Sequence, residues 1–259
     1  MENLQEISKT TIVDSVFTKN PFGNMSKKYV HIPTDNVISD MEKLGWVVTE
    51  SKEVKARKKK GYQKHIVKFY HPDLLIKGEN GDDTFPQILM INSHDGSTAF
   101  QFRVGLYRIV CTNGLVVADA EFGKLSIRHM GYTFEKLQNL ISELVEKIPS
   151  LVNKIKTFQE CQLTDEQMMK FALDASTKRF GDKYKVNADD LLLPTRTADE
   201  GHSLWTVFNR VQEKLMNGGF NTVNSKTNKG RSSRSVKSFA KNIKLNEELW
   251  ALANEYVCK

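Results

Sequence analysis

The longest concentration of strand-forming apolar residues lies between residues 86 and 119. Two turn signals interrupt it, Asp95-Gly96 and Asn113-Gly114, and such pairs favour tight hairpin turns because glycine adopts positive φ without a steric penalty. The pattern predicts an antiparallel meander of three strands, at residues 87–93, 99–111 and 115–118. The alternation of apolar and polar residues slips by one position beside Gly105, which predicts a β-bulge in the middle strand.

Two apolar segments upstream of this meander, residues 46–49 and 65–70, flank a run of basic residues. They predict a β-hairpin whose long tip is basic and flexible. A helix is expected before it, over residues 35–45, with Thr34 or Asp35 as its N-cap. Residues 1–28 carry no regular pattern and are expected to form an irregular arm.

The most regular helical pattern follows the meander, where eight apolar residues alternate at spacings of three and four positions. This heptad seam consists of Phe134, Leu137, Ile141, Leu144, Ile148, Leu151, Ile155 and Phe158. Pro149 removes a backbone donor, so a kink or break is expected there. The seam allows two interpretations, self-association or packing on the protein's own core. The proline favours the second, because it weakens a long straight coil.

Three more helices are predicted from apolar periodicity and capping residues, at residues 164–180, 204–217 and 236–257. The stretch 222–235 has few apolar anchors and predicts a flexible basic loop. Because strands come first and helices second, we expect an α+β fold: an N-terminal antiparallel sheet with a basic hairpin, followed by a mainly helical C-terminal half. The expected regions are an arm over residues 1–28, a sheet domain with the long helix over 29–160, and a helical region over 161–259.

The net charge of +7 is unevenly distributed along the chain. Residues 52–64 hold seven basic residues and one acid, whereas residues 226–244 hold seven basic residues and no acid. These segments carry +6 and +7, so the rest of the chain sums to about −6. Positive charge concentrated on an acidic background is expected of a protein that binds a polyanion locally; solvated loops that are basic for solubility are the alternative.

Other features narrow the class of protein. No apolar run approaches the roughly 18 residues of a membrane-spanning helix, and the segment MENLQEISKT lacks the pattern of an export signal. We therefore expect a cytoplasmic protein without a membrane partner. The three cysteines, Cys111, Cys161 and Cys258, are far apart and form no CxxC pair, which predicts reduced thiols rather than a disulfide framework or a zinc site.

Catalytic motifs are absent from the sequence, which has no Walker-type phosphate loop, dinucleotide fingerprint, HExxH or GxSxG. His94-Asp95 lies at a predicted turn and could form a general-base or metal site with His129, and Asp95, Asp119 and Glu121 could gather as acidic metal ligands. The simpler interpretation is that Asp95-Gly96 only makes the hairpin turn. We therefore predict no catalytic residue, no metal and no cofactor.

Several short motifs resemble a known family. They are Cys111-Thr112-Asn113-Gly114-Leu115, Asn92-Ser93-His94-Asp95-Gly96-Ser97, Arg128-His129, and Leu204-Trp205 followed by Asn209. In this order they resemble the phage/plasmid-like protein family, a domain of unknown function common in bacterial mobile elements, over about residues 30–220. The resemblance implies a phage or plasmid origin and the cytoplasm of a bacterial host, without an agreed activity. The layout of the first half is also similar to that of phage single-strand annealing proteins, which form rings that hold single strands in a basic groove.

Charge and resemblance together predict a non-enzymatic nucleic-acid-binding protein of a phage or plasmid. We expect it to bind or anneal single strands, with single-stranded DNA as its partner, and to act as a homo-oligomer. The residues expected to contact phosphates are Lys55, Arg57, Lys58, Lys59, Lys60, Lys64, Arg231, Arg234, Lys237 and Lys241. The residues expected to offer stacking faces are Tyr62, Phe69 and Tyr70. One alternative is an interaction protein whose basic loops dock an acidic partner, for example an inhibitor of a host defence system; another is an enzyme that uses His94, Asp95 and His129.

Overall fold

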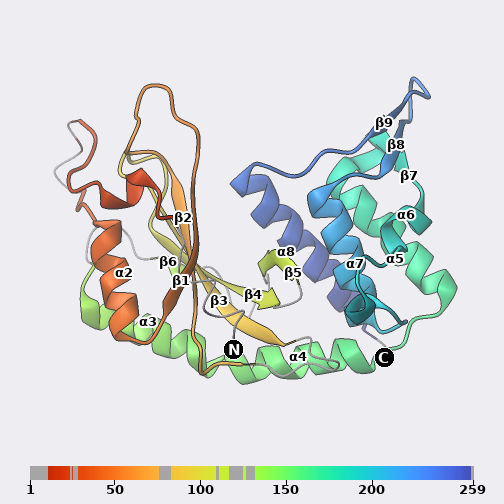
Figure 1. Ribbon diagram of the computed structural model, residues 1–259, viewed down its shortest axis with the longest axis horizontal. Coiled ribbons are helices and arrows are strands. Elements are labelled where there is room, and N and C mark those ends of the chain that lie inside the picture. The colour runs from red at the N-terminus through yellow and green to blue at the C-terminus, as the bar shows by residue number, and fades with distance from the viewer. Residues whose placement is uncertain are drawn as a thin grey trace. The chain divides into compact units, whose positions relative to one another are not determined.

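The computed structural model describes residues 11–23, 25, 29–75, 83–108, 111–116, 125–126 and 132–257. These residues form two compact units, whose elements are labelled in Figure 1. Unit 1 contains the described residues up to Ile148 except strand β5 (Cys111–Val116), and unit 2 contains β5 and the residues from Pro149 onward. The division therefore falls at the predicted proline break, and not at residue 160.

Unit 1 is built on an antiparallel sheet in the order β1-β2-β3-β4, with β6 paired to β4. Its strands are β1 (Val47–Glu53), β2 (His65–Tyr70), β3 (Thr84–Asn92), β4 (Gln101–Arg108) and β6 (Leu125–Ser126). Its helical elements are the 3-10 turn η2 (Asp14–Phe17), α2 (Thr34–Lys43) and α3 (Phe134–Glu146). Helix α2 packs against β1, and β3 is buried along its whole length. The central strand of the sheet is therefore its core.

The predicted basic hairpin is confirmed, because β1 and β2 pair antiparallel from Val47 with Tyr70 to Glu53 with His65. The predicted bulge at Gly105 is wrong, since this residue faces Gln87 in unbroken register between β3 and β4. Residues 104–106 are all buried. A strand buried on both faces carries apolar residues at consecutive positions. In the sequence this looks like a one-residue shift in the alternation of apolar and polar residues, although the strand has no bulge.

The predicted turn at Asn113-Gly114 is also wrong, because both residues lie inside β5. Strand β4 ends at Arg108 and β5 begins at Cys111, and residues 109–110 lie outside the described part of the chain. The turn at Asp95-Gly96 is confirmed. There the Ser97 amide donates to the Asp95 carboxylate over 3.0 Å, and Gly96 adopts φ of 71°.

Unit 2 is mainly helical, with a small antiparallel sheet in the order β7-β8-β9. Its helical elements are α4 (Ile148–Glu160), α5 (Asp165–Phe180), η4 (Gly181–Lys183), α6 (Ala188–Leu192), η5 (Thr197–Asp199), α7 (Leu204–Asn217) and α8 (Phe239–Glu255). Its strands, besides β5, are β7 (Tyr184–Val186), β8 (Asn221–Asn224) and β9 (Gly230–Ser232). Helix α5 begins with the predicted capping box at Thr164. The α+β plan, with the sheet first and the helices second, is confirmed.

The core of unit 2 is a cluster of aromatic rings at the meeting of its helices. Trp250 of α8 lies with its ring centroid 5.0 Å from that of Phe158 and 5.8 Å from that of Phe208. All three side chains are almost completely buried. Large aromatic residues bury the most apolar area per side chain, so this cluster is the main hydrophobic contribution that holds the helices together.

The stretch 222–235 differs from its expected loop, because its residues 222–224 and 230–232 lie in the paired strands β8 and β9. Phe220 and Thr222 are buried, and they anchor β8. The connection between the strands is short: Asn224 accepts hydrogen bonds from the amides of Lys226 and Thr227, and Asn228 adopts φ of 55°. Two buried residues are enough to hold β8 in a sheet because β7 pairs with it. The sequence of residues 222–235 alone cannot reveal this partner strand.

The heptad seam is interrupted at Lys147, where α3 ends and α4 begins at Ile148. The seam residues Leu137, Ile141 and Leu144 on α3, and Leu151, Ile155 and Phe158 on α4, are buried within one copy of the chain. The seam therefore belongs to the protein's own core and does not offer a free face for self-association.

Cys161 is disulfide-bonded, so the expectation of three reduced thiols is wrong. Distance along the chain excludes CxxC chemistry, but it does not exclude a pair that folding brings together. Among the described residues, no helix combines the length and the apolar character needed to cross a membrane.

Truncation of the seam should unfold the protein. Ile141→Ala and Leu144→Ala remove side chains that are 4% and 3% exposed, and each should lower the free energy of unfolding by about 2–5 kcal/mol, measured by urea denaturation. Phe134→Ala, at a seam position that is 39% exposed, is the matched control and should cost much less. A double variant that keeps full stability but changes its mass in light scattering would show that the seam joins copies instead.

Candidate nucleic-acid interface

The first predicted basic set lies at the tip of the β1–β2 hairpin in unit 1. Its exposed members, which form no ion pair with any described residue, are Lys55, Arg57, Lys58 and Lys60. Lys59 is less exposed, because its Nζ lies 3.4 Å from a carboxylate oxygen of Asp95 and 5.3 Å from the ring centroid of Phe22. Lys64 lies at the base of the tip, where its carbonyl accepts from the Val54 amide. The tip thus presents four solvated cations on a closed hairpin.

The three predicted stacking residues lie in different surroundings. Phe69 is completely buried, and Tyr70 is 6% exposed with its ring edge-on to Phe85. A nucleobase needs an accessible ring face, so these two core residues cannot serve one in the folded unit. Tyr62 is half-buried and packs edge-on against Phe22 at 5.2 Å. Its position beside the tip leaves it as the one member of the predicted stacking set with an accessible ring.

Three histidines gather in unit 1 around the predicted His94. The ring centroid of His94 lies 4.7 Å from that of His31 and 5.1 Å from that of His65. The Thr34 hydroxyl lies 2.8 Å from Nε2 of His65 and 3.3 Å from Nε2 of His94, and Asn92 donates to it over 3.0 Å. No group of His, Cys, Asp and Glu in the described part of the chain has an arrangement that could hold a metal ion.

Hydrogen-bond partners fix the protons of this cluster. Nδ1 of His65 lies 3.0 Å from the Gln63 carbonyl, which only accepts, so His65 carries its proton there and accepts the Thr34 hydroxyl proton at Nε2. That hydroxyl has no second proton, so Nε2 of His94 donates to it. Burial lowers the pKa of His65 and of His31, in opposition to their backbone hydrogen bonds. The cluster is thus a hydrogen-bonded network that joins α2 to the sheet.

Asp95 is the remaining member of the predicted catalytic set that lies among the described residues. Asp95 accepts from the Ser97 amide and pairs with Lys59, as a turn residue does. These partners lower the pKa of Asp95, in opposition to the desolvation that raises it. His129, Asp119 and Glu121 lie outside the described residues.

The second predicted basic set lies in unit 2, where two of its four members, Lys237 and Lys241, line a cleft. The cleft has a volume of about 450 Å³ and lies where the C-terminal end of α5 meets residues 235–238 and the first half of α8. Its basic lining residues are Lys178, Arg179, Lys237, Lys241 and Lys244. One acid, Glu248, lines it as well, and its carboxylate lies 3.5 Å from Lys244. The cleft therefore carries a concentrated positive charge.

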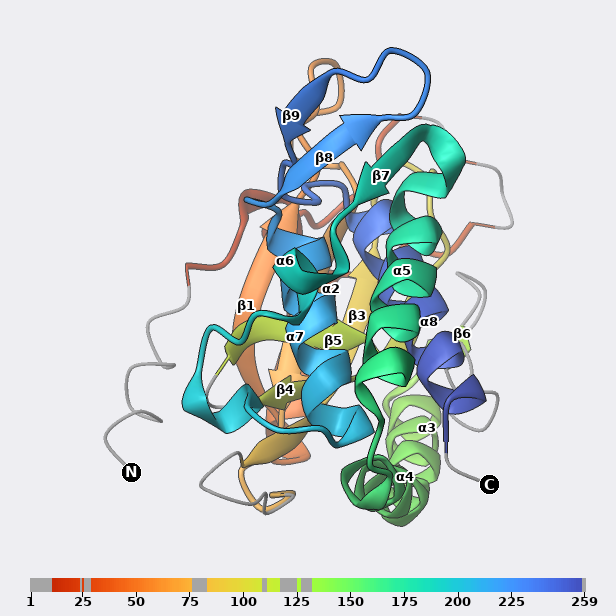
Figure 2. The same ribbon diagram turned by 90° about the vertical axis from the view of Figure 1, so that its right-hand side faces the viewer.

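Arg179 connects this cleft to the β7-β8-β9 sheet, which lies beyond the C-terminal end of α5 in Figure 2. Its guanidinium donates to the carbonyls of Leu215 and Arg234 and lies over the rings of Phe180 and Phe220, at 4.7 and 5.8 Å from their centroids. Gly218 permits this arrangement, because a side chain there would lie 2.7 Å from the Arg234 backbone. The segment that carries Arg234 and the cleft lysines is thereby fixed to α5 and α7.

The charge pattern of the sequence predicts Lys237 and Lys241 of the C-terminal segment as binding residues, but it does not reveal Lys178, Arg179 and Lys244 as members of the same surface. Lys244 lies at the end of the basic run itself. Lys178 and Arg179 lie in the last turn of α5, where basic residues are common because they oppose the negative end of the helix dipole. Their local pattern therefore gave no sign that they face residues some 60 positions away.

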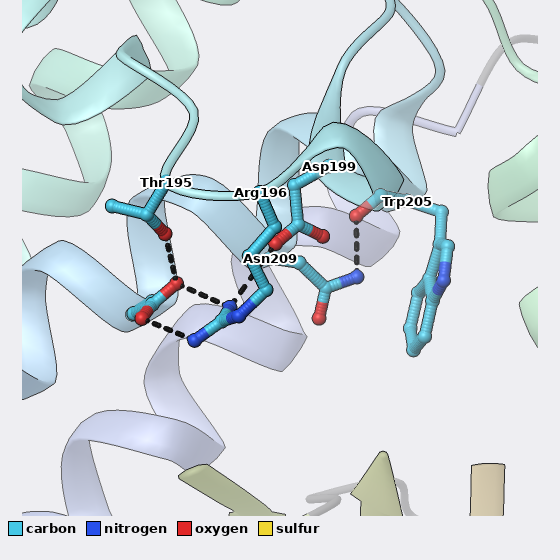
Figure 3. Close-up of polar contacts among 6 residues, drawn as sticks. Thr195, Arg196, Asp199, Trp205 and Asn209 are labelled. Atoms are coloured by element: carbon cyan, nitrogen blue, oxygen red, sulfur yellow. Dashed lines mark hydrogen bonds and ion pairs between the residues drawn. The ribbon is translucent and has the colours of Figure 1, made fainter. Parts of the chain in front are cut away.

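The motif residues of α7 have structural roles, which Figure 3 shows. Asn209 donates to the Trp205 carbonyl one turn earlier over 2.7 Å, and both side chains are buried. Beside them Arg196 makes two hydrogen bonds of 2.7 Å to Glu213 and one of 3.3 Å to Asp199. The bidentate contact between Arg196 and Glu213 holds the segment before α7 against the helix. The W-x-x-x-N motif therefore identifies part of the scaffold rather than a binding residue.

Comparisons with known proteins show the family of the chain. Residues 21–250 match the family described as "Domain of unknown function (DUF932)". The "UPF0380 protein YafZ" of Escherichia coli (strain K12) is 30% identical over 246 residues, which cover 93% of this chain and 87% of YafZ. The "UPF0380 protein YfjQ" of the same strain is 29% identical over 245 residues, with the same coverage. No solved structure matches the chain significantly.

The histidine cluster predicts a pH-dependent stability. Burial holds the pKa of His65 below the ordinary 6.5, so the unfolded chain binds more protons once the pH falls below that value. The free energy of unfolding should therefore be highest above pH 6.5 and should fall toward pH 5, by up to about 1.4 kcal/mol per pH unit for one histidine. Urea denaturation of His65→Gln should give a flatter profile, whereas His202→Gln, whose side chain is 58% exposed, should not. Equal profiles for wild type and His65→Gln would contradict this assignment.

Proposed function

We propose a function on the premise that the chain belongs to the family described as "Domain of unknown function (DUF932)", whose description leaves the activity open. The protein binds nucleic acid and holds a single strand by its phosphates, without catalysing a reaction. The observation that carries this proposal is the cleft of unit 2, where five cations surround a volume of about 450 Å³ and the single acid is already paired.

The electrostatics of the cleft favour a ligand with several negative charges. Lys237 and Lys241 are exposed and form no ion pair within the described part of the chain, so their charges repel one another and those of Lys178 and Lys244. Helix α8 adds its positive end, because its first turn holds no acid and the Ser238 hydroxyl makes no capping bond. A chain of phosphates neutralises these charges in sequence, and the release of its counterions supplies binding free energy.

The cleft continues into a longer basic surface. Arg179 lines the cleft, and its pKa is lowered by burial and by the nearby charge of Arg231 on β9. Arg234, which follows β9 along the chain, is exposed. A flexible single strand can follow such a curved row of cations over several phosphates. The hairpin tip of unit 1 offers a second set, with Lys55, Arg57, Lys58 and Lys60 unpaired among the described residues.

A phage or plasmid origin, an annealing activity and a homo-oligomeric state extend the same proposal. A protein that binds through modest basic patches gains affinity when many copies lie along one strand. Because the seam residues are buried within one copy, an oligomer would have to form through another surface. The resemblance to phage single-strand annealing proteins remains a prediction.

Binding should weaken steeply with salt. If about six phosphates are neutralised, the log–log slope of affinity against salt should be on the order of −4 for a single strand. Lys237→Ala with Lys241→Ala removes two of the cleft cations, and the slope should become shallower by about 1.4. The measurement is fluorescence anisotropy with a labelled single-stranded oligonucleotide at several salt concentrations.

The matched control is Lys156→Ala, since Lys156 is exposed on α4 and does not line the cleft. Its slope and affinity should equal those of the wild type. The absence of detectable binding at low salt, to DNA and RNA strands alike, would reject the proposed function. An unchanged slope for the double variant would move the contact away from the cleft.

A further inference from the structure

An aromatic ring with a planar cation lies at the end of the basic surface of unit 2. The guanidinium of Arg231 lies over the ring of Tyr184, with its Cζ 4.0 Å from the ring centroid. Lys183 lies near the same ring at 5.7 Å, and the Phe180 ring packs edge-on against it at 6.0 Å. Tyr184 is half-buried and Arg231 is exposed. The pair is thus both oriented and accessible to solvent.

The register of the small sheet holds this pair in place. Val186, Thr222 and Arg231 are opposite one another across β7, β8 and β9. Tyr184, two residues before Val186, shares their face of the sheet because side chains alternate along a strand. Thr222 is 1% exposed, so the face is packed beneath the pair. The stack is therefore built on paired strands and a buried neighbour, and not on a loop.

We propose that Tyr184 and Arg231 form a stacking site for an unpaired nucleobase, which gives the surface of unit 2 its selectivity for single strands. The guanidinium plane and the phenol ring both offer flat faces on which a base can stack. No described carboxylate pairs with Arg231, so its outer face is not already occupied by an ion pair. This proposal rests on the proposed function, because phosphates bound in the cleft bring the base to the pair.

Single strands gain from this site and duplexes do not. Bases in a duplex are stacked on one another and present only their edges, whereas an unpaired base exposes a whole face. A bare polyanion such as inorganic polyphosphate has no base and can use only the cations. A comparison of a normal single strand, the same strand without bases and polyphosphate therefore separates the contribution of stacking from the contribution of charge.

The test uses the full chain with three ligands of equal charge: a single-stranded DNA oligonucleotide, the same strand with abasic sites, and inorganic polyphosphate. Tyr184→Ala should weaken binding of the normal strand by about tenfold. It should leave the affinities for the abasic strand and for polyphosphate within about twofold of the wild type. Arg231→Lys keeps the charge but loses the planar face, so it should show the same selective loss to a smaller extent.

Lys185→Ala is the control for charge, because Lys185 follows Tyr184 on the opposite face of β7 and is exposed. Any loss it causes should be equal for all three ligands. Equal losses for Tyr184→Ala would overturn the stacking site while the proposed function stands, and wild-type protein that binds none of the ligands would overturn both. If Tyr184→Ala fails to fold, photocrosslinking of wild type with a 5-iodouracil strand decides the matter. A crosslink to the peptide that contains Tyr184 supports the site, and crosslinks only elsewhere reject it.

Discussion

The basic surface of unit 2 depends on the partial burial of one cation, Arg179. Removing a guanidinium from water costs free energy unless its donors are satisfied. Here two backbone carbonyls, of Leu215 and Arg234, accept its protons, and the ring of Phe180 lies under its plane. Those acceptors belong to the end of α7 and to the segment before α8. One side chain of α5 therefore fixes the segment that carries the cleft lysines. This contact requires the backbone at Arg234 to pass close to Gly218, where a side chain would clash with it.

This anchoring has an electrostatic consequence. Burial disfavours the charged form of Arg179, and the nearby charge of Arg231 adds to this effect, so both lower the pKa of Arg179. The cations of the cleft are gathered with one acid among them. A fold that used these residues only for solubility would gain by spreading them apart, because repulsion between like charges destabilises the compact state. Their concentration is compensated when a polyanion binds, which makes a binding role the more economical explanation of the arrangement.

The sequence predicted those parts of the fold whose causes are local. The capping box at Thr164, the Asp95-Gly96 turn and the seam with its break before Pro149 all follow from neighbours along the chain. Parts that depend on distant partners were missed. Asn113-Gly114 lies inside a strand because pairing overrides its turn preference.

The candidate site also contains residues that the sequence predicts and residues that only the fold reveals. The lysines and arginines of residues 226–244 were found by their charge, which is visible in the sequence. Lys178, Arg179 and Tyr184 lie about 50 residues earlier and join them only through the fold of unit 2. Of the three aromatic residues chosen from the sequence, Phe69 and Tyr70 proved to be core. An aromatic residue within a strand that is buried on both faces shows no pattern that separates it from an accessible one.

Two residues of the W-x-x-x-N motif, Trp205 and Asn209, lie in the interior of unit 2. In α7 the buried Asn209 amide satisfies the Trp205 carbonyl, and the indole packs in the core. Identity of 30% over nearly the whole chain supports a shared scaffold, and a shared fold does not by itself imply a shared ligand. The side chains that meet a ligand must be solvated, and in unit 2 these are the lysines and arginines around the cleft. The proposed function therefore depends on the surface charge of unit 2.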